Sequence, residues 1–185
     1  GAHPVGEARG MKALRADLLD FTAEPAFGRP DTQGVRFRPA HWLLIEDGRI
    51  AAVQAEAPGP QWPRDERPGQ LILPGFIDTH VHAPQLDVLA SYGSELLDWL
   101  QRYTFPAEAA WADPALAQAG SQRFLDQLLA HGSTAAQVFP TVHKGSVDAL
   151  FEAALARGMR VIGGKCLMDR NAPAPLCDSV ASAER

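Results

Sequence analysis

Apolar, strand-like segments alternate with amphipathic helices from Gln70 onwards, and this alternation restricts the possible fold more than any other feature. Helices of this length can connect one strand to a parallel neighbour, so the pattern predicts right-handed β-α units in a parallel sheet. The chain supplies three such strands, whereas a complete β/α barrel has eight and usually needs about 250 residues. The predicted strands are 71–78, 134–139 and 159–167, and the predicted helices are 114–132 and 146–158.

The second predicted helix shows the pattern most clearly. Its apolar residues recur at i, i+3, i+4, i+7 and i+8, which places them on one helical face. Ser146 is predicted to cap its first turn, and Gly158 supplies a stop signal after Arg157. The apolar positions are Val147, Leu150, Phe151, Ala154 and Leu155.

The segment 11–70 has a different character and predicts a small antiparallel β unit. Its apolar runs are 13–21, 42–45 and 50–53, and Asp47-Gly48 between the last two is a strong hairpin signal. The stretch 55–69 contains four prolines and is predicted to be a surface loop. Residues 1–10 lack periodicity and precede Met11, so they are interpreted as a tag or a disordered extension.

Composition excludes several classes of protein. An apolar share of 46%, a charged share of 21% and a net charge of −5 describe an ordinary globular chain. There is no cluster of Lys and Arg for nucleic acid, and no apolar run approaches the ~20 residues that span a bilayer. The start of the chain has no signal-peptide core, which predicts a cytoplasmic protein. Cys166 and Cys177 are expected to be reduced thiols.

The chemistry of the chain centres on His80 and His82 at the end of the first predicted strand. Side chains two positions apart in a strand share a face, so both imidazoles are expected to point the same way. Imidazole pairs bind zinc, iron or nickel, and a catalytic metal needs about three protein ligands. A His-x-His pair alone is weak evidence, but barrel active sites are built at this end of the strands. Asp78 shares the same parity and is predicted to orient a ligand histidine.

Several segments resemble a known family. Residues 73–82, LPGFIDTHVH, are similar to the opening barrel strand of the amidohydrolase superfamily, and 46–53, EDGRIAAV, to its small flanking β-sandwich. The resemblance implies an α/β fold, namely a distorted (β/α)8 TIM barrel with a small flanking β-sandwich. Residues 71–185 would hold about the first three β/α units of the barrel, and 11–70 would form part of the β-sandwich. Segments that resemble the guanine deaminases of this superfamily are 83–85 (APQ), 103–108 (YTFPAE) and 168–173 (MDRNAP).

This resemblance also implies a function and a site. It implies zinc-dependent conversion of guanine to xanthine and ammonia, with iron as the alternative metal, by a cytoplasmic homodimer whose partner is a small purine. His80 and His82 become metal ligands, and His82, Ala83, Pro84 and Gln85 form the substrate-binding turn. Further pocket candidates are Trp99, Phe105 and His143, for which packing or surface roles stay open.

The remaining metal ligands and the general acid and base are expected beyond Arg185, so the isolated chain is expected to bind zinc weakly and to lack activity. One alternative is another amidohydrolase, with a triazine, cytosine or adenosine-type substrate. A second is a non-catalytic fragment that acts as an interaction domain, with an exposed sheet edge that needs a partner. A cytidine-deaminase-like enzyme is disfavoured because its His-x-Glu and Pro-Cys-x-x-Cys signature is absent.

Overall fold

The computed structural model describes residues 10–24, 28 and 33–183. Apart from Gly10, the extension predicted at 1–10 therefore lies outside the described residues. The chain forms two compact units, one that ends at Pro74 and one that begins at Gly75. Each unit has its own sheet, so each is described by itself.

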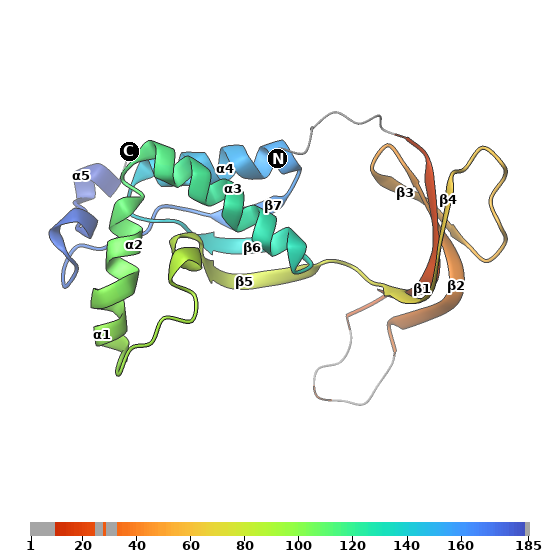
Figure 1. The fold of residues 1–185 in the computed structure, drawn as a ribbon, viewed down its shortest axis with the longest axis horizontal. Helices are drawn as coiled ribbons and strands as arrows, with labels where there is room; N and C mark the ends of the chain where they lie inside the picture. The colour runs from red at the N-terminus through yellow and green to blue at the C-terminus, as the bar shows by residue number, and fades with distance from the viewer. Residues whose placement is uncertain (1–9, 25–27, 29–32, 184–185) are drawn as a thin grey trace. The chain divides into compact units, whose positions relative to one another are not determined.

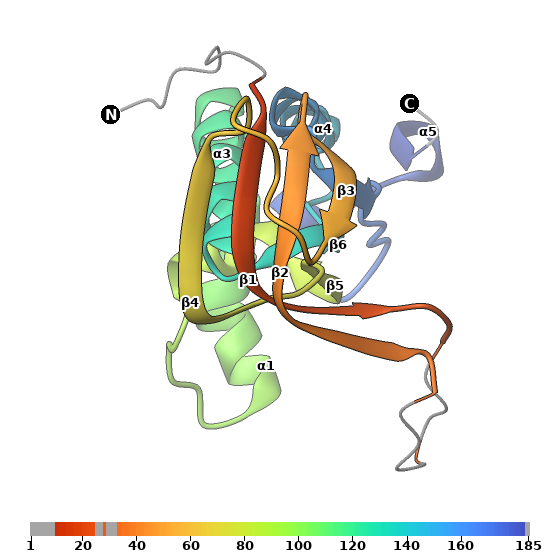
Figure 2. The ribbon, with the colours of Figure 1, turned by 90° about the vertical axis from the view of Figure 1, so that its right-hand side faces the viewer.

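The first unit is a four-stranded sheet with the order β3-β2-β1-β4, which Figure 2 shows face on. The β1–β2 and β2–β3 pairs are antiparallel, and the β1–β4 pair is parallel. The prediction of a purely antiparallel unit is therefore wrong at the β4 edge. Within the described residues these strands form one sheet rather than two packed layers. The strands are β1 (Lys12–Phe21), β2 (Val35–Glu46), β3 (Arg49–Gln54) and β4 (Arg64–Ile72).

The predicted hairpin at Asp47-Gly48 is confirmed. These two residues connect β2 to β3, and Glu46 pairs with Arg49 across the turn. Both turn residues have positive φ, 51° for Asp47 and 74° for Gly48. A two-residue hairpin turn with this backbone matches the right-handed twist of the flanking strands.

The predicted loop 55–69 is wrong in its second half, because β4 begins at Arg64. Pro68 cannot donate a ladder hydrogen bond, and prolines in sheets are confined to edges and bulges. Both conditions hold here, since β4 is an edge strand and its register against β1 shifts between Glu66 and Leu71. Leu71 also belongs to this sheet, so the strand predicted at 71–78 is in fact divided between the two units.

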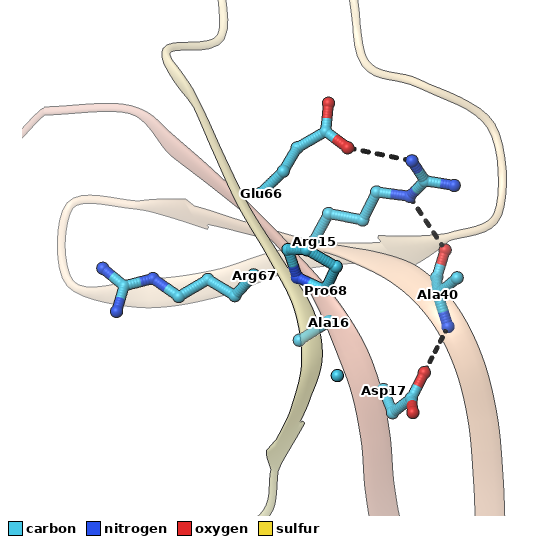
Figure 3. Close-up of a pocket in the computed structure, with 8 residues that line it drawn as sticks. Arg15, Ala16, Asp17, Ala40, Glu66, Arg67 and Pro68 are labelled. Atoms are coloured by element: carbon cyan, nitrogen blue, oxygen red, sulfur yellow. Dashed lines mark hydrogen bonds and ion pairs between the residues drawn. The ribbon is translucent and has the colours of Figure 1, made fainter.

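A bulge where β1 meets β2 is held by side chains (Figure 3). Ala40 has φ 50°, and its backbone groups are bound from β1: its N–H donates to Asp17 at 2.8 Å, and its carbonyl accepts from Arg15 at 3.4 Å. Arg15 also donates to Glu66 at 2.9 Å. The cavity of about 230 Å³ at this bulge is thus lined by charges that already have partners.

The second unit confirms the predicted β-α pattern. Its three strands are parallel in the order β5-β6-β7, and the helices α3 and α4 lie side by side on one face of the sheet (Figure 1). Leu125 and Leu150 are fully buried in the layer between helices and sheet. The elements are β5 (Phe76–His82), α3 (Pro114–Ala130), β6 (Ser133–Phe139), α4 (Lys144–Arg157) and β7 (Arg160–Gly163).

The ends of α4 follow the sequence prediction at one end only. Gly158, with φ 63°, ends the helix as predicted. The predicted N-cap Ser146 instead lies in the first turn, because the helix begins after His143. The Ser146 hydroxyl donates to the His143 carbonyl at 2.7 Å and contacts the Thr141 hydroxyl at the same distance. Ser146 is thus a buried residue that bonds to the segment before the helix, and it does not cap the helix.

A continuous helical segment between β5 and α3 contains one wide turn. Its middle part is a π-helix, and Pro106 explains this, because proline has no N–H to donate to the carbonyl of Arg102 four residues earlier. The segment consists of α1 (Leu96–Trp99), the π-helix η2 (Leu100–Thr104) and α2 (Phe105–Ala110). The remaining short helices are η1 (Ala83–Val88), η3 (Ala174–Leu176) and α5 (Val180–Ala183).

None of the described helices is long and apolar enough to cross a membrane.

Candidate functional site

His80 and His82 lie close together at the carboxyl end of β5. Their ring centroids are 5.3 Å apart, and each lies 4.9 Å from the ring of Phe139, the last residue of β6. His82 is stacked on Phe139 with an interplanar angle of 20°. The shared contact with Phe139 places both imidazoles on the same side of the sheet, as the His-x-His spacing predicts.

Asp78 does not share that side. Between Asp78 and Val81 the register gains one residue relative to β6, so strict alternation is interrupted. Asp78 pairs with Ala136, which is buried against the helices, and paired residues in a parallel sheet point to the same face. The Asp78 carboxylate accepts the backbone N–H of His80 at 3.0 Å. The predicted role in orienting a histidine ring is therefore corrected to a backbone contact at the bulge.

His82 is half-buried, and one of its ring nitrogens has no partner. Its Nδ1 is buried and makes no hydrogen bond among the described residues. The closest recorded acceptor is Oε1 of Glu108, at 3.9 Å. Burial lowers the pKa of His82, and the neighbouring His80 adds to this effect. The ring is therefore neutral at neutral pH, which is the form that binds metals.

Glu108 on α2 is a buried carboxylate that our sequence reasoning did not assign to the site. It is only 7% exposed. Burial raises the pKa of Glu108, and the nearby side chain of Gln85 acts in the opposite direction. The spacing gave a signal: Thr104, Glu108 and Trp111 follow at i, i+4 and i+7 and so share one helical face, and all three are buried.

The two histidines are the candidate metal ligands of the described residues. Across residues 10–24, 28 and 33–183, no group of three or more His, Cys, Asp or Glu side chains could hold a metal ion. The pair itself fits a first-row metal, because both rings share one side of the sheet and His82 is kept neutral. The donor set is thus compatible with a metal but short of the usual three ligands.

A cavity of about 700 Å³ lies beside β5 and brings four of the candidate residues together: His80, His82, Gln85 and Trp99. Trp99 is held by a hydrogen bond from its Nε1 to the Ser91 hydroxyl at 3.0 Å. Cavities of 300–1,000 Å³ are typical for small ligands. Ala83 and Pro84 are buried next to this cavity in η1, whereas Phe105 and His143 do not line it. Its further lining comes from Asp78, Val81, Leu86, Leu89, Leu100, Phe124, Gln127, Leu128, His131 and Ser133.

His143 belongs to a separate polar cluster. Its backbone N–H donates to the Thr141 hydroxyl at 3.0 Å, and its Nε2 is buried without a hydrogen-bond partner among the described residues. Burial lowers the pKa of His143, Lys165 lowers it further, and Asp178 opposes the shift. Lys165 itself pairs with Asp178 at 2.8 Å. Lys165 is thus engaged in an ion pair beside His143.

The family comparison matches the second unit. The family model described as "Amidohydrolase family" covers residues 71–185, which is more than half of the chain. The chain belongs to the amidohydrolase family. The mixed α/β architecture of the described residues is thus part of an amidohydrolase fold, although they form an open three-stranded sheet and no closed barrel.

Individual amidohydrolases are similar over almost the whole chain. The guanine deaminase of Escherichia coli is 42% identical over 179 residues, which are 94% of this chain and 40% of that protein. Its solved structure has a TM-score of 0.80 at 41% identity and covers 92% of this chain and 41% of its own. The guanine deaminase of C. acetobutylicum, solved with guanine bound in the active site, has a TM-score of 0.74 at 28% identity and covers 94% and 40%. This amidohydrolase chain therefore spans about 40% of the length of these relatives.

Proposed function

We propose that this chain is part of a metal-dependent guanine deaminase, which hydrolyses guanine to xanthine and ammonia. The observation that carries the proposal is the 42% identity to the E. coli guanine deaminase over 94% of the chain. The guanine bound to the C. acetobutylicum protein supports a purine as the substrate. Residues 71–185 would then form about the first three units of a distorted β/α barrel, and 11–70 would contribute to a small β-sandwich.

His80 and His82 would hold the metal, which we propose to be zinc, with iron as the alternative. When bound, zinc supplies a water nucleophile at neutral pH because it lowers the pKa of a coordinated water to about 7. The role of the chain's own residues is to keep the donors neutral and fixed. Burial keeps His82 uncharged, and the stacking on Phe139 restricts its ring.

The substrate-binding turn follows directly after His82. Ala83 and Pro84 are buried and anchor the turn, and Gln85 presents a planar amide with one acceptor and two donors. Such an amide can bind the mixed donor and acceptor edge of a purine. Trp99 adds an aromatic face to the same cavity, on which a planar ring can stack. Phe105 and His143 lie outside this cavity and are left out of the proposed site.

Guanine turnover by the whole protein tests the proposal. The zinc-loaded protein is expected to release xanthine and ammonia from guanine, measured by chromatography and by coupled ammonia detection. The matched panel contains cytosine, adenosine and an amino- or chlorotriazine at the same concentration. Guanine should be preferred by at least a hundredfold in kcat/KM. Preference for any other member of the panel would replace guanine as the substrate.

We further propose that the whole protein is a cytoplasmic homodimer that binds no nucleic acid. Support comes from the family resemblance and from the absence of a Lys and Arg cluster in the sequence. Sedimentation equilibrium of the whole protein is expected to give twice the mass of its polypeptide. A monomeric mass would contradict this part of the proposal.

A further inference from the structure

Glu108 lies where the proposed metal site meets the proposed purine site. Its carboxylate is 3.9 Å from Nδ1 of His82, and the side chain of Gln85 lies close enough to lower its pKa. Thr104, the last residue of the π-helix, and Glu108 four residues later are both buried, so the same helical face carries both. One carboxylate therefore faces both a candidate ligand and a candidate recognition residue.

A buried carboxylate is costly unless something compensates for the loss of water. Within the described residues no lysine or arginine pairs with Glu108; the side chains that interact with it include His82, Gln85 and the thiol of Cys166. An apolar side chain would fill this position on the helix at lower cost. The placement of a charge here points to a role in the site rather than in packing.

We propose that Glu108 is a positioning residue that orients both His82 and Gln85. The inference rests on the proposed function and extends it to a residue outside the metal pair and the 82–85 turn. A carboxylate only accepts hydrogen bonds, so each partner must turn an N–H towards it. Glu108 therefore determines which atoms of His82 and Gln85 remain free for the metal and the purine.

For His82 the consequence concerns the tautomer. Its Nδ1 is buried and faces the carboxylate, so the proton belongs on Nδ1 and the lone pair on Nε2 is left for a metal. Histidine ligands in metal sites commonly donate their second ring N–H to a carboxylate in this way, and loss of that carboxylate typically costs about 10–100-fold in metal affinity.

For Gln85 the consequence concerns the orientation of the amide. An isolated amide can be turned by 180° at little cost, which exchanges its donor and acceptor. Because a carboxylate only accepts hydrogen bonds, the amide nitrogen of Gln85 must face Glu108, and the amide oxygen with one further N–H stays available. A purine edge is then read by a fixed pattern rather than by two exchanging ones.

The substitution Glu108→Gln in the zinc-loaded whole protein tests this role. It keeps the shape of the side chain but adds a donor, so neither partner is held in one orientation. The dissociation constant for zinc is expected to rise about 10–100-fold, and KM for guanine about tenfold or more. Glu152→Gln, at an exposed site on α4, is the matched control and should change neither. If both quantities stayed within twofold of wild type, the proposal would be overturned.

A double-mutant cycle with Gln85→Ala separates positioning from general destabilisation. If Glu108 acts on the purine through Gln85, Glu108→Gln should no longer change KM in the Gln85→Ala background. Additive effects on KM would overturn the link. Circular dichroism monitors the folding of each variant. If Glu108→Gln unfolds, the zinc dissociation constant and KM for guanine are measured on Glu108→Asp, which keeps the carboxylate. A wild-type protein that binds zinc without deaminating guanine contradicts the proposed function, whereas the zinc affinities still test Glu108.

Discussion

Gly120 of α3 lies directly against the indole ring of Trp111, the residue that follows α2. A Cβ atom added to Gly120 would come within 2.5 Å of Cζ2 of Trp111. Trp111 is only 5% exposed, so its ring has no free space into which to move. Trp111, directly after the helix that contains Glu108, therefore belongs to the same core as the buried residues of α3.

Replacement of Gly120 by alanine is therefore expected to destabilise the fold, although alanine favours helices. The gain in helix propensity is about 1 kcal/mol, whereas overpacking in a core costs about 1–3 kcal/mol, and here the overlap is severe. We expect a net loss of about 1–2 kcal/mol in the free energy of unfolding, measured with urea. Gly145→Ala on α4, where a Cβ would meet nothing within 4 Å, is the control and should be neutral or slightly stabilising. Equal effects of the two substitutions would contradict this account.

The end of α4 gives a prediction based on backbone conformation alone. Gly158 has φ 63°, and a Cβ atom added to it would meet no other atom within 4 Å, so only backbone strain opposes a side chain there. Gly158→Ala should cost about 1–2 kcal/mol, and Gly158→Asn clearly less, because asparagine tolerates the left-handed region. Thermal unfolding of both variants, followed by circular dichroism, measures this order. An alanine variant as stable as the asparagine variant would be inconsistent with strain.

The proposed metal site predicts how the substitution of His80 changes zinc binding and activity. In the whole protein, His80→Ala removes one of two neighbouring imidazoles and should abolish guanine turnover together with loss of bound zinc, measured by atomic absorption. His41→Ala, on β2 in the first unit, is the matched control and should retain metal and activity. Unchanged activity of His80→Ala would refute its assignment as a ligand.

The 185-residue chain by itself is expected to bind zinc weakly and to show no guanine turnover. The reason is that His80 and His82 supply two donors, while the described residues contain no cluster of three or more. Metal content after dialysis and xanthine release are the measurements. Robust turnover with one zinc ion per chain would show that the donor set is complete without further residues.

Cys166 is expected to be an unreactive thiol. Burial, with a smaller contribution from Glu108, raises its pKa to about 11. At pH 8 only about one molecule in a thousand then carries the thiolate, and alkylation should accelerate about tenfold per pH unit towards pH 11. In the 185-residue chain a Cys177→Ser variant leaves Cys166 as the single thiol, and iodoacetamide labelling followed by mass spectrometry gives its rate. Rapid labelling at pH 7 would contradict the raised pKa.

Local patterns were sufficient to predict much of the secondary structure. Helical spacing identified α3 and α4, and the Asp-Gly pair identified the hairpin between β2 and β3. These features depend on residues a few positions apart, whose φ preferences and shared faces act within one element. The pairing of His80 with His82 on one side of β5 is of the same kind.

Long-range pairing could not be predicted in this way. The parallel addition of β4 to β1 overrides the loop character of a proline-containing segment, because the edge of an existing sheet offers hydrogen bonds that no local pattern reports. The bulge between Asp78 and Val81 likewise follows from the register against β6, and it places Asp78 on the face of the sheet that Ala136 shares.

The sequence by itself determined the β-α order, the imidazole pair and the turn that carries Gln85, since each depends on spacing along one segment. Only the tertiary structure placed Glu108 beside His82 and Gln85, residues that lie well before it in the chain. The physical reason is that a carboxylate on a helix acquires its role from what the packed helix faces. Here the buried face is the one that carries Thr104, Glu108 and Trp111.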